Sequence, residues 1–232
     1  MVVDIQLDTN ANIAKVIKTS NGKKKAIDVS VEDLISSIKA TSNKKTNNSF
    51  KTIINPLHQK EDGFELIQSI QTGKNDFIYI FKVDKKNVPF YIYDKFFGLC
   101  GMPRMLIAIR LVNSVFNAMY VNVIKDSKVT LDTQMYEYPF SNVNSYNGHV
   151  CFGRNIFKQK FETVESMFRI INYFFEIPNT METFNILNNS GAFQFRELAE
   201  LLADTEFDDG LLVPKKCAVN TYSKWIEKFT RL

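Results

Sequence analysis

One segment of the chain, residues 138–155, carries a cysteine in a setting that suits nucleophilic chemistry. It reads YPFSNVNSYNGHVCFGRN, which predicts an extended strand end, a polar loop over Asn144–Gly148 and a short apolar return to Cys151. A thiolate acts as a nucleophile where a substrate can reach it, as at the exit of a loop. Asn142, at the start of the same loop, supplies an amide that can stabilise the oxyanion formed when a thioester is attacked. The segment therefore predicts thioester chemistry on Cys151.

Each of these residues also has a plainer explanation. Free cysteines are most often buried, so the alternative for Cys151 is a strand cysteine of the core, although the flanking residues favour a nucleophile. Asn142 can be a turn residue whose side chain bonds to nearby backbone. His149 lies two residues before Cys151, and on a strand this spacing puts both side chains on one face. A histidine there can assist deprotonation near neutral pH or be an ordinary solvated residue.

Other catalytic motifs do not occur in the sequence. It has no glycine-rich phosphate loop, no CxxC or HExxH metal motif and no GxSxG elbow, and its histidines are His58 and His149. We therefore expect no cofactor and no metal. Cys100 and His58 could form a cysteine-protease dyad, but Cys100 lies in the sequence GLCG, where a buried turn cysteine is the simpler interpretation.

The composition is that of a globular protein that binds no nucleic acid specifically. Of the 232 residues, 45% are hydrophobic and 20 are Phe, which is enough for a packed core. The net charge of +4 is slight, and its lysine runs are short and scattered, whereas nucleic-acid binders concentrate charge on one face. The three cysteines lie far apart and are odd in number, so we expect a reducing, cytoplasmic environment and no disulfide framework.

No membrane segment is predicted. Asp4 and Asp8 fall where a secretory signal would have to be apolar. The most apolar region, Phe96–Ile124, is interrupted by Arg104 and Arg110. It cannot supply the about 20 uninterrupted apolar residues that a membrane helix needs.

Residues 1–75 are predicted to form an N-terminal accessory region. Short strand patterns occur at three places, namely Ile5–Leu7, Ile13–Ile17 and Ala26–Val29. Ser30, with Asp33 three residues later, is a plausible N-cap for a helix with an apolar stripe that reaches Ile38. A polar linker over Thr41–Ser49 and a second short helix over Phe64–Ile70 complete this region.

Residues 76–232 are predicted to form the core, with strands first and helices after. The strand patterns are separated by tight polar turns, as in an antiparallel meander, and cover Phe77–Val83, Val88–Tyr93, Met105–Ile109, Ala118–Ile124 and, more weakly, Gln134–Tyr138. Thr163 then caps a helix with one continuous apolar face that Pro178 closes. Two more amphipathic helices are expected over Ala192–Ala203 and Val219–Phe229. The predicted fold class is α+β, with helices packed on an antiparallel sheet.

The cysteine segment resembles ubiquitin-conjugating enzymes. These enzymes carry a His-Pro-Asn motif, then a loop of the type N-x-x-G-x-V-C that ends at the catalytic cysteine. Phe140-Ser141-Asn142-Val143 is similar to that motif plus the following aliphatic residue, and Gly148-His149-Val150-Cys151 is similar to the loop's ending. The spacing from Asn142 to Cys151 is one residue longer than the usual eukaryotic pattern. The predicted helix after the cysteine, ending at Pro178-Asn179, corresponds to the family's crossover helix.

Within that superfamily the chain resembles the prokaryotic E2-like family D, known as PRTRC system protein B. Its motifs are similar to three segments of this chain, Pro103–Ile107, Ala118–Ile124 and Met135–Gly153, and the likeness extends over about residues 76–185. It implies a conjugating-enzyme-like core and a bacterial, phage or plasmid origin. The partners it implies are a ubiquitin-like protein, a ThiF-type activating enzyme and a JAB-type metalloprotease from the same operon.

The resemblance also assigns residue roles, with two departures. Phe140 stands where the family has histidine and Ser141 where it has proline, so of that motif only Asn142 remains. The histidine is mainly structural in the family. Glu182, three residues after the Pro178-Asn179 pair, falls where conjugating enzymes often have an acidic gate that orients and deprotonates the incoming lysine. An ordinary exposed glutamate is the alternative.

The sequence thus predicts an enzyme that accepts a ubiquitin-like protein as a thioester on Cys151 and transfers it to an amine. Two other hypotheses stay open. The first is an inactive conjugating-enzyme fold that only binds a ubiquitin-like protein, which the lost His-Pro pair favours and the retained cysteine disfavours. The second is an interaction protein of a mobile element with Cys151 buried.

Overall fold

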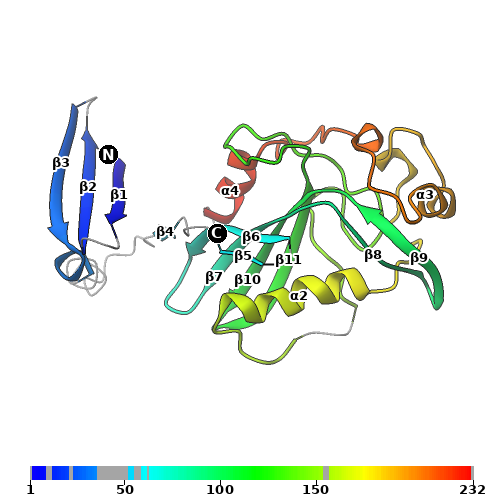
Figure 1. The fold of residues 1–232 in the computed structure, drawn as a ribbon, viewed down its shortest axis with the longest axis horizontal. Coiled ribbons are helices and arrows are strands. Elements are labelled where there is room, and N and C mark those ends of the chain that lie inside the picture. Colours follow the sequence, from blue (N-terminus) through cyan, green and yellow to red (C-terminus); the bar gives the residue numbers. More distant parts are fainter. Residues whose placement is uncertain are drawn as a thin grey trace. The chain divides into compact units, whose positions relative to one another are not determined.

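The computed structural model describes residues 2–8, 12–20, 23–35, 52–54, 59–61, 63–153 and 157–230. The chain divides into two compact units, Met1–Phe50 and Lys51–Leu232. Figure 1 draws the ribbon of each unit.

The small unit is a three-stranded antiparallel sheet. Its strands are β1 (Val2–Asp8), β2 (Ile13–Ser20) and β3 (Lys23–Ser30), in the spatial order β1-β2-β3. A helical turn follows at residues 31–35, where the Ser30 hydroxyl accepts from the Asp33 N–H at 3.0 Å and donates to the Asp33 carboxylate at 2.7 Å. These features confirm the three predicted strands and the cap. Ile38 and the linker Thr41–Ser49 lie outside the described residues.

The large unit is built on an antiparallel sheet with the strand order β11-β10-β7-β6-β4, and β5 also pairs with β6. The strands are β4 (Thr52–Ile54), β5 (Gln59–Glu61), β6 (Phe64–Gln71), β7 (Phe77–Val83), β10 (Met105–Val112) and β11 (Val115–Val123). A separate hairpin of β8 (Lys86–Ile92) and β9 (Lys95–Met102) is inserted between β7 and β10 (Figure 1). The fold is thus α+β with antiparallel sheets, as predicted.

Helix α2 (Val164–Glu176) covers one face of the large sheet (Figure 1). Thr163 caps it by accepting from the Ser166 N–H, and its ridge of Met167, Ile170 and Ile171 is buried in the main core. The ring of Phe168 stacks on Phe64 of β6 at 5.4 Å. The predicted cap and helix are therefore confirmed.

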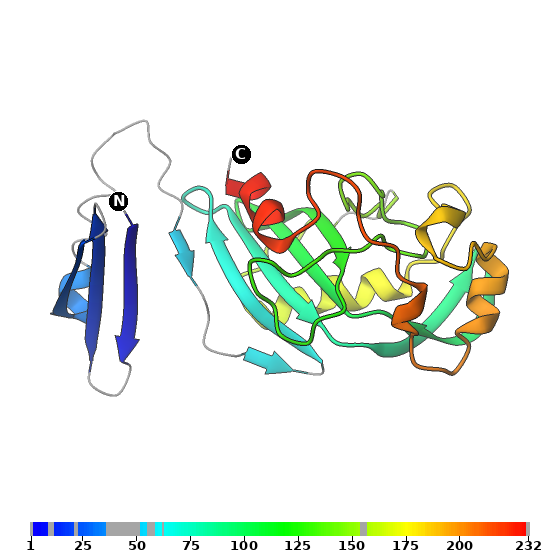
Figure 2. The same ribbon diagram turned by 90° about the horizontal axis from the view of Figure 1, so that it is seen from above.

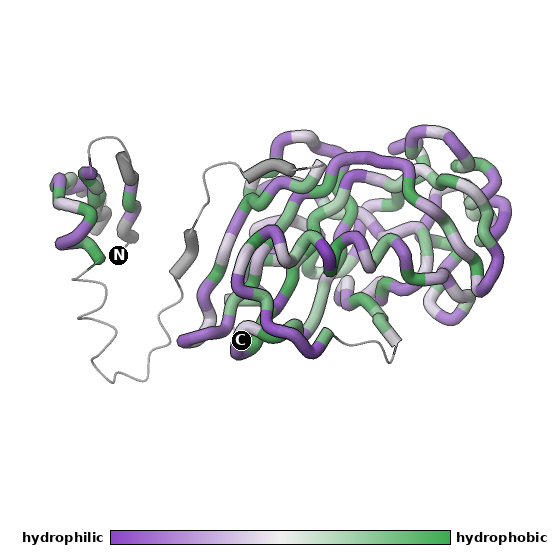
Figure 3. Tube along the Cα trace, turned by 60° about the horizontal axis from the view of Figure 1, so that its bottom comes forward, coloured by the Kyte–Doolittle hydropathy of each residue, from purple (hydrophilic) through white to green (hydrophobic). Residues whose placement is uncertain are grey.

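Helix α4 (Tyr222–Thr230) covers part of the opposite face, as the view from above shows (Figure 2). A second apolar cluster lies there, with Ile80 of β7 and Ala108 of β10 beside Trp225 and Phe229. The strands are mostly hydrophobic through the middle of this unit, while hydrophilic segments gather in turns and along its outer edges (Figure 3). Shorter elements follow α2, namely η1 (Ile186–Asn188), α3 (Phe195–Leu201) and η2 (Asp209–Leu211).

Three structural predictions need correction. The helix expected at Phe64–Ile70 is strand β6, whose pairing with β7 places it in the main sheet, so the unit boundary falls after residue 50 and not after residue 75. Cys100 lies in strand β9 and not in a turn. Gln134–Tyr138 forms no strand of its own and makes single bridges, one of them between Tyr136 and Val123 of β11.

Candidate functional site

The segment around Cys151 returns along the edge of the large sheet. The Val150 N–H donates to the Met119 carbonyl at 2.9 Å, and the Val121 N–H donates to the Gly148 carbonyl at 2.7 Å, so residues 148–150 run beside β11. The Cys151 N–H donates to the Asn142 carbonyl at 2.8 Å, which closes the loop at its base. The predicted polar loop with an apolar return is confirmed.

The loop between these ends has a fixed backbone. The Asn144 side-chain oxygen accepts from the N–H groups of Tyr146 at 3.0 Å and Asn147 at 3.2 Å, and the Gly148 N–H donates to the Asn144 carbonyl at 2.7 Å. Gly148 has φ +74°, and a Cβ at that position would lie 2.6 Å from the Val121 carbonyl oxygen. A side chain cannot be accommodated there, so glycine is required for the loop to approach β11.

Cys151 is the exposed member of the three cysteines. Cys100 is 2% exposed, and burial raises the pKa of its thiol to about 12, which makes it a poor nucleophile. Cys217 is half-buried, with its sulfur 3.6 Å from the Val219 carbonyl oxygen. The interpretation of Cys151 as a buried strand cysteine is therefore wrong.

His149 and Cys151 share the exposed face of the returning segment, as their spacing predicts. Val150 between them is buried, whereas both neighbours are exposed. The imidazole of His149 stands edge-on to the Tyr120 ring, with centroids 5.5 Å apart. This contact holds the ring beside the strand edge, and the described structure gives it no ion pair or side-chain hydrogen bond.

Asn142 is fixed by the segment that follows α2. Asn142 is 9% exposed and has φ +65°. Its side-chain amide donates to the Pro178 carbonyl at 3.0 Å, and its backbone N–H donates to the Thr183 hydroxyl at 2.6 Å. The neighbouring Ser141 hydroxyl donates to the Asn179 side-chain oxygen at 2.8 Å and accepts from the Thr180 N–H at 3.1 Å. Asn142 thus shapes the loop base, and its role at an oxyanion stays a prediction.

Phe140 occupies the core. It is fully buried, and its ring lies 5.2 Å from that of Phe90 and 5.7 Å from that of Tyr138. A histidine at this position would bury a polar ring among aromatic side chains, which is costly without a hydrogen-bond partner. Phe140 therefore serves as a packing residue under the loop.

Glu182 lies in the turn after α2 and is exposed. Its neighbour Thr183 contacts Asn142, so the turn borders the loop base. Within the described part of the chain Glu182 has no ion pair or hydrogen bond. The structure therefore brings together Asn142 and Cys151 directly, with His149 beside the cysteine and Glu182 in a neighbouring turn.

A buried charged pair that the sequence does not indicate also supports the loop. The ammonium of Lys215, which is 5% exposed, donates to the Ser145 carbonyl at 3.1 Å and lies 3.8 Å from a Glu137 carboxylate oxygen. Asn188 donates to the Ser145 hydroxyl at 3.0 Å and to the Tyr138 carbonyl at 3.1 Å. Burial lowers the pKa of Lys215 and raises that of Glu137, and each charge partly offsets the shift of the other. These partners are distant in sequence, so no local pattern reveals them.

The requirements of a metal site, a membrane helix and the suggested Cys100–His58 dyad can each be compared with the described residues. Among them, no three His, Cys, Asp or Glu side chains gather as metal ligands would. No helix in the described part of the chain has the length and apolar character to cross a membrane. His58 lies outside the described residues, and its suggested partner Cys100 is buried in β9.

Comparison with known proteins found no significant similarity. No protein-family model matches the chain, and no curated protein or solved structure is significantly similar to it. The loop itself and the motif resemblance of its residues are therefore the basis for any function.

Proposed function

We propose that this protein accepts a ubiquitin-like protein as a thioester on Cys151 and transfers it to an amine. One observation carries the proposal. Cys151 is an exposed thiol at the end of a loop whose backbone is held in place from both sides, by β11 and by the segment after α2. A fixed, reachable thiol is what acyl transfer between large partners requires.

The chemistry has two steps. In loading, the Cys151 thiolate attacks the thioester carbonyl on the activating enzyme, a new C–S bond forms, and the activating enzyme's cysteine leaves as a thiolate. In discharge, an amine attacks the Cys151 thioester, a C–N bond forms, the C–S bond breaks, and the amine loses a proton to a base. Both steps pass through a tetrahedral oxyanion.

Three nearby residues can contribute to these steps. The Asn142 amide has two hydrogens, and the Pro178 carbonyl takes one of them, so the other can serve an oxyanion. Glu182, exposed and beside the residue that contacts Asn142, can take the proton of an incoming lysine. His149 shares the face of Cys151 and can accept the thiol proton.

The order of elements fits the resemblance to conjugating enzymes of the prokaryotic E2-like family D. Antiparallel strands precede the cysteine loop, and helix α2 follows it and ends at Glu176, shortly before Pro178-Asn179. Those two residues contact the loop base through Asn142 and Ser141. A ubiquitin-like protein, a ThiF-type activating enzyme and a JAB-type metalloprotease are the partners that this resemblance proposes.

A second candidate is a module of the same fold that binds a ubiquitin-like protein without catalysis. The residues at the family's His-Pro positions favour it. Phe140 is buried in the core, and the Ser141 hydroxyl donates to the Asn179 side-chain oxygen. Such a module would bind the partner but would leave Cys151 unacylated.

The test is a loading reaction with the ubiquitin-like protein and activating enzyme encoded beside this gene, supplied with ATP. We expect an adduct that reductant removes. The Cys151→Ser variant should form no such adduct, or should form an oxyester that resists reductant. The matched variant Cys217→Ser should form the same adduct as the wild type. Because Glu182 acts on the acceptor, Glu182→Ala should slow discharge to lysine and leave loading intact. Binding of the ubiquitin-like protein without any adduct would replace the catalytic proposal with the binding module.

A further inference from the structure

The β8–β9 hairpin is packed against the large unit on one of its two faces. Its inner face joins the main core, where Val88, Phe90 and Cys100 are buried. Figure 1 shows the hairpin extending beyond the main sheet with α3 near β9, and Figure 2 shows the same arrangement from above. The outer face of the two strands is therefore the face that a partner can reach.

Both edges of the hairpin already carry hydrogen bonds. On the β8 edge, the Asn179 N–H donates to the Tyr91 carbonyl and the Tyr93 N–H donates to the Asn179 carbonyl, each at 2.9 Å. On the β9 edge, the Asp204 N–H donates to the Leu99 carbonyl at 2.8 Å. A strand added at either edge would have to displace these bonds, so a partner is expected to contact the outer face.

Four exposed apolar residues share this outer face, and we call them the hairpin patch. Leu99 stands opposite Pro89, and Phe96 stands opposite Tyr91. The register shifts between these two pairs, and Gly98, with φ +99°, lies at the shift. The shift brings Phe96 and Leu99 onto one face although they are three residues apart. The rings of Tyr91 and Phe96 lie 5.1 Å apart, and Phe96 is 59% exposed, so the patch is contiguous and faces solvent.

Carboxylates border the hairpin patch on the side of α3. The chain has a net charge of +4, yet residues 194–211 contain one basic residue, Arg196, and six acidic ones, namely Glu197, Glu200, Asp204, Glu206, Asp208 and Asp209. Asp204 is exposed beside Leu99, and its carboxylate makes no ion pair or hydrogen bond in the described part of the chain. The Arg196 guanidinium is engaged, since it lies 5.5 Å from the centre of the Phe97 ring and 4.0 Å from a Glu200 carboxylate oxygen.

We propose that the hairpin patch binds a partner protein through a segment that presents apolar side chains between lysines or arginines. The apolar side chains would lie on Phe96 and Leu99, and the basic ones would pair with Asp204 and its acidic neighbours. Asp94 and Lys95, in the turn between the strands, offset each other, so the acidic side toward α3 sets the sign of the charge. The same carboxylates disfavour an anionic membrane surface. This inference does not depend on the function proposed for Cys151.

A labelled helical peptide made of leucine and lysine is the probe. Its fluorescence anisotropy should rise to saturation as full-length protein is added, and added salt should weaken the binding. The same peptide with glutamate in place of every lysine should show no saturable binding. Absence of saturable binding by the lysine peptide, or equal binding of the two peptides, would overturn the proposal.

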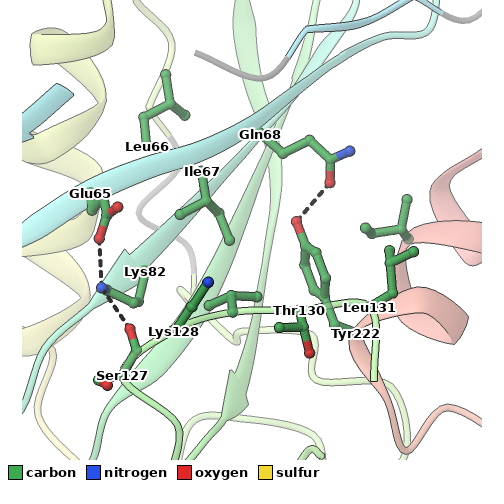
Figure 4. Close-up of a pocket in the computed structure, with 12 residues that line it drawn as sticks. Glu65, Leu66, Ile67, Gln68, Lys82, Ser127, Lys128, Thr130, Leu131 and Tyr222 are labelled. Carbon is green, nitrogen blue, oxygen red and sulfur yellow. Dashed lines mark hydrogen bonds and ion pairs between the residues drawn. The ribbon is translucent and has the colours of Figure 1, made fainter. Parts of the chain in front are cut away.

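Variants locate the binding on the hairpin patch. Leu99→Ser should raise the half-saturating protein concentration about fivefold to tenfold, as loss of an apolar anchor does, and Asp204→Asn about twofold to threefold. The matched controls lie on another surface of the large unit, where the exposed Leu131 stands with Lys128 at a pocket between β6 and α4 (Figure 4). Leu131→Ser and Asp132→Asn should leave peptide binding unchanged, because that surface is not bordered by carboxylates in excess.

Other outcomes would assign the hairpin patch differently. An unchanged half-saturating concentration in Leu99→Ser, or an equal change in Leu131→Ser, would place the peptide elsewhere and overturn the proposal. Sedimentation velocity and pelleting with phosphatidylserine vesicles examine two other occupants. Self-association or vesicle binding that Leu99→Ser abolishes, without peptide binding, would replace the basic partner with a second copy of the chain or with a membrane.

Discussion

The buried Lys215–Glu137 pair should make the cysteine loop sensitive to a substitution far from it in sequence. In Lys215→Met, the Glu137 carboxylate loses its counter-ion and the Ser145 carbonyl loses a charged donor. Breaking a buried pair from one side typically costs about 3 to 5 kcal/mol. The Glu137 side chain keeps 17% exposure and can take up a proton, so we expect a smaller loss, about 2 to 3 kcal/mol.

The double variant Lys215→Met/Glu137→Leu is the matched control. Replacing both charges with apolar side chains leaves no buried charge unpaired, so the double variant should regain most of the stability that the single variant loses. Urea unfolding followed by the fluorescence of Trp225, which lies in the large unit, measures both at neutral pH. A single variant as stable as the wild type, or a double variant no better than the single, would refute the reasoning.

The pair also predicts a pH dependence with a definite sign. Burial raises the folded-state pKa of Glu137, so its contribution to stability is present at acid pH and is lost as pH rises through that folded pKa. Burial lowers the folded-state pKa of Lys215, so its contribution is present at pH above the ordinary lysine value and is lost as pH falls through the folded pKa. The plot of unfolding free energy against pH should therefore be flatter in the double variant across both windows.

Three further outcomes are expected. Under mild iodoacetamide treatment of the folded protein, mass spectrometry should find Cys151 alkylated first, Cys217 later and Cys100 last, and early labelling of Cys100 would contradict the burial argument. Gly148→Ala should lower the melting temperature, because a left-handed backbone costs a non-glycine residue about 1 to 2 kcal/mol before any clash is counted; an unchanged melting temperature would refute the loop geometry. Asn142→Ala should slow thioester discharge by about 10²-fold while loading survives, and unchanged discharge would leave Asn142 with a loop-shaping role alone.

How far the sequence predicts this fold depends on how regular each pattern is. The α2 helix has a capping threonine, an unbroken apolar face and a closing proline, so its bounds follow from local chemistry. Burial alternates along the whole of strand β6, but apolar Ile67 takes a half-buried position and polar Gln68 a buried one. The apolar residues Phe64, Ile67 and Ile70 therefore fall at a near-helical spacing in the sequence, although the segment is a strand.

The candidate site likewise has one part that the sequence predicts and another that it does not. The loop ending at Cys151 can be predicted because its turn residues and the cysteine are adjacent in sequence. Its supports cannot, since Ser145 and Lys215 meet only through the tertiary fold, and nothing local marks a lysine as buried. Strand β9 has the local pattern of a turn because two glycines flank Cys100 closely, and the partners that bury it lie on other elements.

The most direct test of the account is loading of a chain in which Cys151 is the only cysteine. Cys100→Ala and Cys217→Ser remove the other two thiols, and the loading reaction with activating enzyme, ATP and ubiquitin-like protein is followed by intact-mass spectrometry. We predict one reductant-sensitive adduct of the mass of a single ubiquitin-like protein joined through a thioester. A folded single-cysteine chain that stays unmodified where the activating enzyme itself becomes charged would contradict the central claim. So would a reductant-sensitive adduct that still forms when Cys151 alone is replaced.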